Sequence, residues 1–377
     1  MNNYKNTAIC FMNDLPYLKE PYSKRNWGSK WHSLCSYHGK LKPSIAHLLI
    51  KTFTERGDIV LDPLSGVGTI PFEACLQGRI GMGNDLSNLA FVVSKAKLEF
   101  PKVDETLVVV NDLEKYINNN RLKYLNKQIP YSNFGFNKTL KDYYERNTFV
   151  EIVLAREFFK NKHKLSSSEA LVMASLMHVL HGNRPYALSR RSHSLTPYAP
   201  SGEFEYKNLI KHIKNKLKIV FSEDIQNYTR GEMFYGDALQ IHKKMNKKVD
   251  VIISSPPFAA SIKFYTHNWL RLWFAGWEPE DFKNAQETFL DSLQKKDMGI
   301  YLQFFSMCSE VLKDKGKLIL HLGKTKNCNM ADELIKYSER WFKVIYVADE
   351  DVSQIEKHGV KDKGGTTHHQ FLFLEKR

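Results

Sequence analysis

The 377-residue chain lacks the cysteine spacing of a zinc-binding or disulfide-stabilised protein. Its five cysteines are scattered, odd in number, and form no CxxC pair, whereas both kinds of framework use closely spaced or paired cysteines. The N-terminus has no charged-then-apolar layout of a signal peptide, and no run of about 18 apolar residues is long enough to span a bilayer. We therefore expect a cytoplasmic protein that has no metal centre.

Acidic residues are also few in proportion to basic ones. The chain has 41 Asp and Glu against 55 Lys and Arg, a formal net charge of +14. Such an excess is typical of proteins that bind a polyanion, and nucleic acid is the first candidate. Hydrophobic residues make up 42% of the chain, enough for a substantial core. The length suits two domains, or one large domain with an insertion.

The first part of the chain predicts a nucleotide-binding unit. Residues 1–30 are polar and turn-rich, which indicates an N-terminal arm. The expected elements that follow are a helix with Ser44 as its N-cap (44–54), a buried strand (58–62), a glycine loop, a helix (71–77) and a second strand (79–85). A strand, glycine loop, helix and strand ending on an acid form one βαβ unit of the type that binds nucleotides.

The same alternation returns near the C-terminus, after an interruption. Apolar β-type runs are expected as strands at 249–253, 317–322, 344–347 and 370–374, with helices at 299–313 and 331–341. This pattern predicts an α/β, Rossmann-like fold: a mostly parallel sheet with helices on both faces and an antiparallel strand at its edge.

Residues 88–230 interrupt the alternation and are basic and helix-rich. A capping box of Ser166 and Glu169 opens one predicted helix, and another is expected at 206–222. We therefore divide the chain into an α/β domain (31–87 and 231–377) and a helical insertion (88–230).

The glycine loop runs Asp62-Pro63-Leu-Ser-Gly66-Val-Gly68-Thr69. Glycine lets the backbone approach a ligand closely, and a helix follows at once. Asp85 ends the next strand, where an acid can accept hydrogen bonds from ribose hydroxyls. Pro71 replaces the third glycine of the pyrophosphate fingerprint, so a nucleoside without phosphate fits better, and S-adenosylmethionine is such a cofactor. The alternatives are a plain tight turn for the loop and a surface acid for Asp85.

A second motif, Ser255-Pro256-Pro257-Phe258, follows the strand at 249–253. The prolines fix the backbone and remove two N–H donors, which leaves carbonyl oxygens and the Ser255 hydroxyl to accept hydrogen bonds from an amino group. Phe258 offers a flat face for a base. An exocyclic amine is a poor nucleophile, and acceptors that hold its N–H bonds free the lone pair for direct methyl transfer. The chain has no Pro-Cys pair, which disfavours covalent methylation of cytosine C5.

These motifs resemble those of the S-adenosylmethionine-dependent DNA amino-methyltransferases. DPLSGVGT is similar to their DPFxGSGT cofactor motif, and SPPF to their (S/T/D/N)PP(Y/F) motif. The resemblance implies cofactor roles for the loop residues, for the upstream segment His38–Ser44, and for the acid that follows Gly236. The cofactor residues so predicted are Lys42, Pro43, Asp62, Pro63, Gly66, Gly68, Thr69, Asp85 and Asp237.

Within that family, Ser255 and the segment Asn268–Gly276 resemble the cytosine-N4 enzymes, although the cofactor loop precedes SPPF here and follows it in many of them. The resemblance implies a site-specific DNA methyltransferase acting on cytosine N4 of a base flipped out of double-stranded DNA. Restriction–modification with a cognate restriction endonuclease is the expected setting, and a monomer the expected state. The alternatives are an adenine-N6 DNA methyltransferase, an RNA guanine-N2 methyltransferase, and a catalytically inactive nucleic-acid-binding subunit.

The insertion is the expected reader of the DNA target. Cations and aromatics alternate in one stretch that contains few acids, and arginine can pair with guanine or phosphate while tyrosine can stack. A solvated basic loop is the alternative. The predicted DNA-binding residues are Arg184, Tyr186, Arg190, Arg191, His193 and Tyr198.

Overall fold

The structure is a computed structural model of the whole chain. It describes residues 2–37, 39–162, 164–182, 186–191, 199–259, 264–352, 356–357, 360–361 and 365–377.

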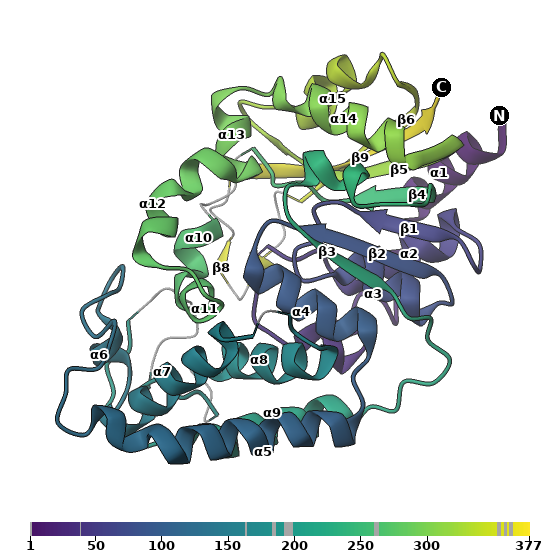
Figure 1. The fold of residues 1–377 in the computed structure, drawn as a ribbon. Coiled ribbons are helices and arrows are strands. Elements are labelled where there is room, and N and C mark those ends of the chain that lie inside the picture. The colour runs from purple at the N-terminus through teal and green to yellow at the C-terminus, as the bar shows by residue number, and fades with distance from the viewer. Residues whose placement is uncertain are drawn as a thin grey trace.

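A seven-stranded sheet forms the centre of the α/β domain (Figure 1). Its strands are β1 (Ile59–Asp62), β2 (Ile80–Asp85), β3 (Glu232–Tyr235), β4 (Val249–Ser254), β5 (Leu312–Thr325), β6 (Phe342–Asp351) and β9 (Thr366–Lys376). They lie in the order β3-β2-β1-β4-β5-β9-β6. Short strands β7 (Glu356–Lys357) and β8 (Val360–Lys361) pair separately.

The predicted mostly parallel, Rossmann-like sheet is confirmed. Strands β3 to β5 pair in parallel, and only β9 runs antiparallel to both of its neighbours. The expectation that the antiparallel strand lies at the edge is wrong, because β9 inserts between β5 and β6. Its apolar run from Phe371 to Leu374 is fully buried, which suits an interior strand rather than an exposed one.

Helices cover both faces of the sheet. One face packs against α1 (Asn2–Asp14), α2 (Pro43–Phe53) and α3 (Thr69–Leu76). The opposite face packs against α14 (Ile300–Val311), α15 (Met330–Ser338) and the short turn η4 (Ala238–Lys243). Helix α2 begins at Pro43 with Lys42 as its N-cap, two residues before the expected N-cap Ser44, because proline is favoured at the first helical position.

The N-terminal residues form a packed helix, so the expected arm is wrong for this segment. Ala8 and Phe11 of α1 are buried, and the Phe11 ring lies 5.5 Å from that of Phe53 in α2. Tyr4, two turns before Phe11 on the same side of the helix, has its ring 6.3 Å from that of Phe373 in β9. The helical period of these three residues was hidden among asparagines and lysines.

The helical body consists of α5 (Val103–Asn120), α6 (Leu140–Tyr143), α7 (Arg146–Lys160), α8 (Ser167–Val179) and α9 (Leu209–Phe221). Figure 1 shows it as a layer beside the sheet, joined to it through α4 (Asn88–Glu99). The capping box of Ser166 and Glu169 forms as predicted. Helix α4 contacts β2, β3 and α3, so it covers the sheet, and the helical body begins after residue 100.

Between β4 and α14 the chain forms helices α10 (Phe264–His267), α11 (Trp269–Phe274), α12 (Pro279–Thr288) and α13 (Leu290–Lys296). Short turns are η1 (Pro16–Leu18), η2 (Lys30–Ser33) and η3 (Arg121–Tyr124). Among the described residues, no helix is long and apolar enough to cross a membrane.

Candidate active site

The two predicted motifs meet at the carboxyl ends of neighbouring strands. β1 and β4 pair in parallel, so the residues that follow them emerge at the same edge of the sheet. Ser254, the last residue of β4, donates a hydrogen bond of 2.7 Å from its hydroxyl to Asp62 Oδ1 at the end of β1. This contact places the Ser255–Phe258 corner directly beside the glycine loop.

The loop after β1 requires its glycines. Gly66 and Gly68 have φ angles of 51° and 69°, a region that residues with a side chain rarely adopt. A Cβ on Gly68 would also lie 2.8 Å from the hydroxyl of Ser94, which itself donates to the Gly66 carbonyl at 2.9 Å. The loop is therefore held in one conformation, with Thr69 at the start of α3.

The glycine missing from the fingerprint at Pro71 is compensated on the facing strand. A Cβ on Gly81 of β2 would lie only 1.9 Å from the Pro71 carbonyl oxygen. The close approach of α3 to β2 that such a fingerprint provides therefore depends here on Gly81.

Two carboxylates stand at the base of the loop. Asp85 accepts hydrogen bonds of 2.9 Å from the backbone amides of Gly66 and Ser87, and burial raises its pKa to about 6. Asp62 is 3% exposed and also accepts from the amide of Leu64 at 3.1 Å. Burial, and to a smaller extent the nearby charge of Asp85, raise the pKa of Asp62 to about 7.

The loop after β3 lies beside the ends of β1 and β2, and the residues that follow these three strands form what we call the rim. The Gly236 amide donates to the Asp85 carbonyl oxygen at 3.0 Å, and the Asn84 amide group donates to the carbonyls of Gly236 and Pro63 at 3.0 and 3.1 Å. Asp237 is exposed at the start of η4, where its carboxylate accepts from the amide of Leu239 at 2.9 Å. The predicted residues from Asp62 to Thr69, with Asp85 and Asp237, therefore share one rim.

The described part of the upstream segment His38–Ser44 contacts the N-terminal residues and leads into α2. The Lys42 ammonium donates to the carbonyls of Tyr17 and Ser23 at 3.3 and 3.4 Å, so it anchors the N-terminal segment, and Pro43 begins α2. The cofactor role of Lys42 and Pro43 stays a prediction. His38 lies outside the described residues.

Tyr37 and Asp291 are site residues that the motifs did not reveal. A Cβ on Gly66 would lie 3.3 Å from the Tyr37 hydroxyl, so this tyrosine covers the loop. Its pKa is raised well above the usual value by burial, and then by the charges of Asp85, Asp291 and Asp62. Asp291 is 5% exposed, and its Oδ1 has no hydrogen-bond partner among the described residues.

The Ser255–Phe258 corner is fixed by residues from other elements. Gln294 of α13 donates to the carbonyls of Pro257 and Phe258 at 2.9 and 3.3 Å, and Tyr301 holds the Gln294 side chain by a 2.9 Å hydrogen bond. The expectation that any carbonyl of the corner could receive a base amine is therefore too broad. Ser255 Oγ and the Pro256 carbonyl are the remaining candidates.

The Phe258 ring packs on the carboxyl-terminal end of β5. A Cβ on Gly323 would lie 2.4 Å from the ring, so only glycine permits this packing. His321, two residues earlier on β5, lies with its Nδ1 3.1 Å from Ser255 Oγ and its ring 5.6 Å from that of Phe258. No spacing in the sequence links His321 or Gln294 to the corner.

A family model described as RMKL-like, methyltransferase domain (UPF0020) matches residues 30–132. These residues include β1, the glycine loop, β2 and Asp85. This chain carries a methyltransferase domain. S-adenosylmethionine, the expected cofactor, suits its site, because an acid at Asp85 and the cluster with Asp62 and Asp291 match ribose hydroxyls and a cationic sulfonium.

The chain has distant similarity to other known proteins. No curated protein matches it. Similar solved structures include TrmN from Thermus thermophilus (13% identity, 93% of this chain and 53% of that one, TM-score 0.35). They also include a putative rRNA methylase from Clostridium thermocellum (10%, 88% and 96%, TM-score 0.35) and a putative RNA methyltransferase from Pyrococcus horikoshii (11%, 100% and 99%, TM-score 0.34). The methyltransferase spans about half the length of TrmN, and the strand order itself is the evidence for the fold.

The helical body of the methyltransferase uses two predicted DNA-binding residues internally. The Arg190 guanidinium donates to the carbonyls of Gly202 and Asp142 and lies 4.1 Å over the Phe204 ring. The Tyr186 ring stacks on that of His178 at 5.4 Å. These contacts hold the segment in place, so the prediction that both side chains face DNA is not supported by their positions. Arg191 is exposed, and Arg184, His193 and Tyr198 lie outside the described residues.

Helix α11, which lies in the segment that resembles cytosine-N4 enzymes, is a core helix. Trp269 and Trp273 are both buried. Arg156 of α7 donates to the Trp273 carbonyl at 2.8 Å, and Arg271 to the Met177 carbonyl at 3.1 Å. The helix therefore packs against the helical body.

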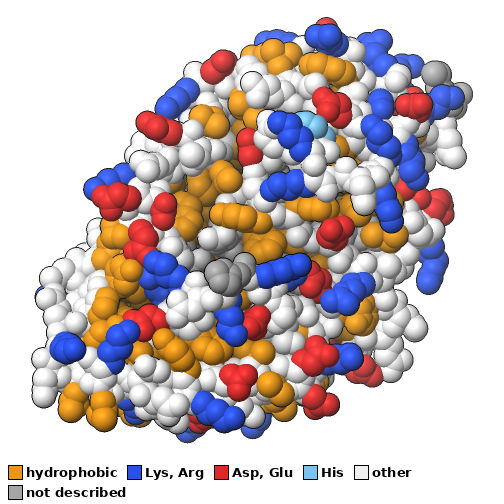
Figure 2. Space-filling model, viewed as in Figure 1, with side chains coloured by type: hydrophobic (Ala, Val, Ile, Leu, Met, Phe, Trp, Pro, Cys, Tyr) orange, Lys and Arg blue, Asp and Glu red, His pale blue; other side chains and the backbone are white. Residues whose placement is uncertain are grey.

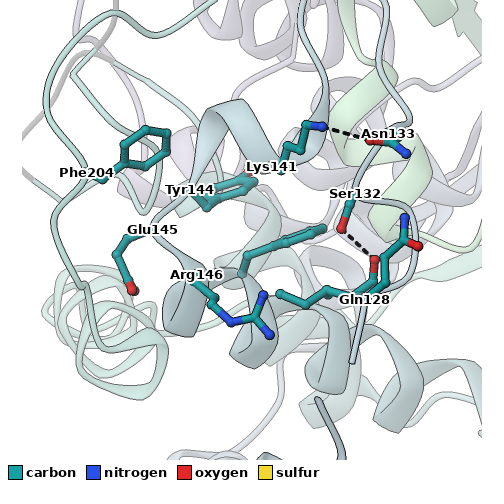
Figure 3. Close-up of a pocket in the computed structure, with 10 residues that line it drawn as sticks. Gln128, Ser132, Asn133, Lys141, Tyr144, Glu145, Arg146 and Phe204 are labelled. Carbon is teal, nitrogen blue, oxygen red and sulfur yellow. Dashed lines mark hydrogen bonds between the residues drawn. The ribbon is translucent and has the colours of Figure 1, made fainter. Parts of the chain in front are cut away.

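The helical body also contains a cavity of about 510 Å³ (Figure 3). Its wall includes Arg146, which donates to the carbonyls of Tyr124, Leu125 and Lys127, and Lys141, which donates to Asn133. None of the residues lining it belongs to the rim or the corner, so it is separate from the candidate active site.

Proposed function

We propose that this protein transfers a methyl group from S-adenosylmethionine to an exocyclic amino group of a base in nucleic acid. The observation that carries the proposal is the hydrogen bond between Ser254 and Asp62, because it brings the SPPF corner against the cofactor rim. Direct transfer needs the amine and the methyl group within about 3–3.5 Å, in line. A cofactor site and an amine-binding corner on adjacent strand ends satisfy that need.

The residues of the rim would bind the cofactor by charge and hydrogen bonding. The cofactor supplies a methyl group on a positively charged sulfur. Asp291 and the partly ionised Asp62 would provide negative charge nearby. Asp85, with both oxygens at the end of β2, would accept the ribose hydroxyls. Asp237 at the end of β3 would contact the adenine edge, as its motif implies.

The corner would hold the amine. Ser255 Oγ and the Pro256 carbonyl would accept its two N–H bonds, which turns the nitrogen lone pair toward the methyl group. Gln294 and Tyr301 keep the backbone of the corner rigid, and the Phe258 ring would stack on the base. Preorganised acceptors of this kind cost no reorganisation when the reaction occurs.

RNA is the first substrate to test, with guanine N2 as the amine. The cofactor loop precedes SPPF, an order that departs from many cytosine-N4 enzymes. Arg190 and Tyr186 are half-buried and already make contacts within the helical body, so less of each side chain is available to read DNA. Bases in RNA loops are already unstacked and accessible to an enzyme.

Cytosine N4 in DNA is the second candidate. Serine at position 255 favours it, since the resemblance associates serine at this position with cytosine-N4 enzymes. For this candidate we expect double-stranded DNA as the ligand, a restriction endonuclease as the partner and a monomeric protein.

The substrate class is tested by transfer of a labelled methyl group to total RNA and to genomic DNA. We expect label that ribonuclease removes and deoxyribonuclease does not. Lysine and arginine are spread over the face in Figure 2 with acids between them, so transfer is expected to weaken as salt is raised. Label confined to DNA would select the second candidate, and label in neither polymer would contradict the proposal.

A further inference from the structure

Behind the Ser255 hydroxyl lies a buried histidine that the methyl-transfer motifs do not include. His321 is 4% exposed on β5, with Nδ1 3.1 Å from Ser255 Oγ. Its other ring nitrogen, Nε2, is buried and has no hydrogen-bond partner among the described residues. Among the described residues, Ser255 is therefore the hydrogen-bond partner of this imidazole.

A second, partly exposed histidine packs beside His321. The ring of His369 on β9 lies 4.9 Å from that of His321, and its side chain is 24% exposed. Glu350 of β6 lies 3.8 Å from His369 Nδ1 and accepts a 2.9 Å hydrogen bond from the hydroxyl of Tyr17. These are the titratable groups that face His321 from β9, β6 and the N-terminal segment.

The surroundings keep His321 neutral. Burial and then the charge of His369 hold the pKa of His321 well below its usual range. A neutral imidazole has one nitrogen with a free lone pair. If that nitrogen is Nδ1, the Ser255 hydroxyl donates to it, and the Ser255 oxygen is left to accept a hydrogen bond from the substrate.

We propose that His321 is the proton acceptor of the reaction, acting through the Ser255 hydroxyl. The inference rests on the proposed function. As the bond from the base nitrogen to the methyl carbon forms, the carbon–sulfur bond breaks and its electron pair stays on the neutral thioether. The nitrogen gives one proton to Ser255 Oγ, and Ser255 passes its own hydroxyl proton to His321 Nδ1. After the methylated base leaves, the Nδ1 proton returns through Ser255 to water, which restores the neutral imidazole protonated at Nε2.

The activity test compares His321→Asn with the wild type and with His368→Asn. His368 is a matched control on β9, where its ring bonds to Thr367 rather than to the corner. In single-turnover methylation of the nucleic acid found to be labelled, we expect His321→Asn to lower the rate about 100-fold at pH 7, with little change in KM. The rate of the variant should rise about tenfold per pH unit from 7 to 9, because hydroxide replaces the lost acceptor, while the wild type stays flat.

Ser255→Ala and the double variant test the path. Because the proton passes through Ser255, the double variant should be no slower than the slower single variant. A flat pH profile for His321→Asn, or additive losses in the double variant, would overturn the inference. Those results differ from failure of the proposed function, in which the wild type labels no nucleic acid.

A second measurement does not depend on activity. Nitrogen NMR of labelled histidine should show His321 as a neutral imidazole protonated at Nε2, with its Nδ1 signal shifted by Ser255→Ala. The tautomer of His321 can be measured on the folded wild type even if a variant fails to fold. Protonation at Nδ1 would overturn the inference, because the Ser255 oxygen would then already accept from His321.

Discussion

Asp85→Asn tests how the rim binds its cofactor. Asp85 now fastens the loop through the Gly66 and Ser87 amides at 2.9 Å. Asparagine keeps one acceptor oxygen and nearly the same shape, so the loop should survive while the negative charge is lost. A hydrogen bond to a charged group contributes about 1.5–3 kcal/mol, which predicts about 10- to 100-fold weaker binding of S-adenosylmethionine at pH 7.

The pH dependence of this loss follows from the pKa of Asp85. Burial raises that pKa to about 6, so Asp85 is about 90% ionised at pH 7 and about 10% ionised at pH 5. At pH 5 the wild-type residue is therefore mostly neutral, like asparagine. The ratio of the two dissociation constants should shrink about tenfold between pH 7 and pH 5, a change of about 1.4 kcal/mol. Titration of Asp62 affects both proteins and largely cancels in this ratio.

Calorimetric titration at several pH values measures this ratio directly. Asp314→Asn is the control, because Asp314 is 97% exposed near the start of β5, away from the strand ends that form the rim. A ratio that stays constant with pH, or one below about twofold at pH 7, would show that Asp85 does not bind the cofactor through its charge.

Three further changes test other parts of the account. Gly68→Ala should lower the midpoint of thermal unfolding, because a left-handed φ costs about 1–2 kcal/mol for a residue with a Cβ and Ser94 must also move; an unchanged midpoint would contradict this. Gln294→Ala should lower the rate of methyl transfer at unchanged cofactor affinity, since it frees the carbonyls of the corner; an unchanged rate would show that the corner is rigid without it. Arg190→Ala should destabilise the fold but change RNA and DNA affinity less than about twofold at moderate salt; a large loss of affinity with normal stability would restore its expected role.

The parts of this protein that the sequence predicted are those with a regular period or a compact motif. Strands such as β1 and β4 are short apolar runs, and the glycine loop and SPPF are contiguous, so their meeting follows from parallel pairing alone. Helix α8 was predicted because its capping box is local, with Ser166 and Glu169 three residues apart.

The parts that were missed depend on contacts between distant segments. Gln294 reaches the corner from 37 residues away along the chain, and His321 from 66, and nothing in their neighbourhoods distinguishes them from ordinary polar residues. The contacts of Arg190 within the helical body also join distant segments, and its predicted role in DNA binding stays a prediction. An arginine among aromatics is typical of a nucleic-acid-binding surface. The same side chain can equally well donate to two backbone carbonyls and pack on one ring within the protein.

The position of the transferred methyl group on the base shows whether an exocyclic amine is the acceptor. Nucleic acid from the labelling reaction is digested to nucleosides and analysed by mass spectrometry against standards. We predict N2-methylguanosine from RNA, with its yield strongly reduced by Phe258→Ala. A methyl group on a ring carbon or on a ribose hydroxyl would contradict the account, because the SPPF corner would then have no amine to hold.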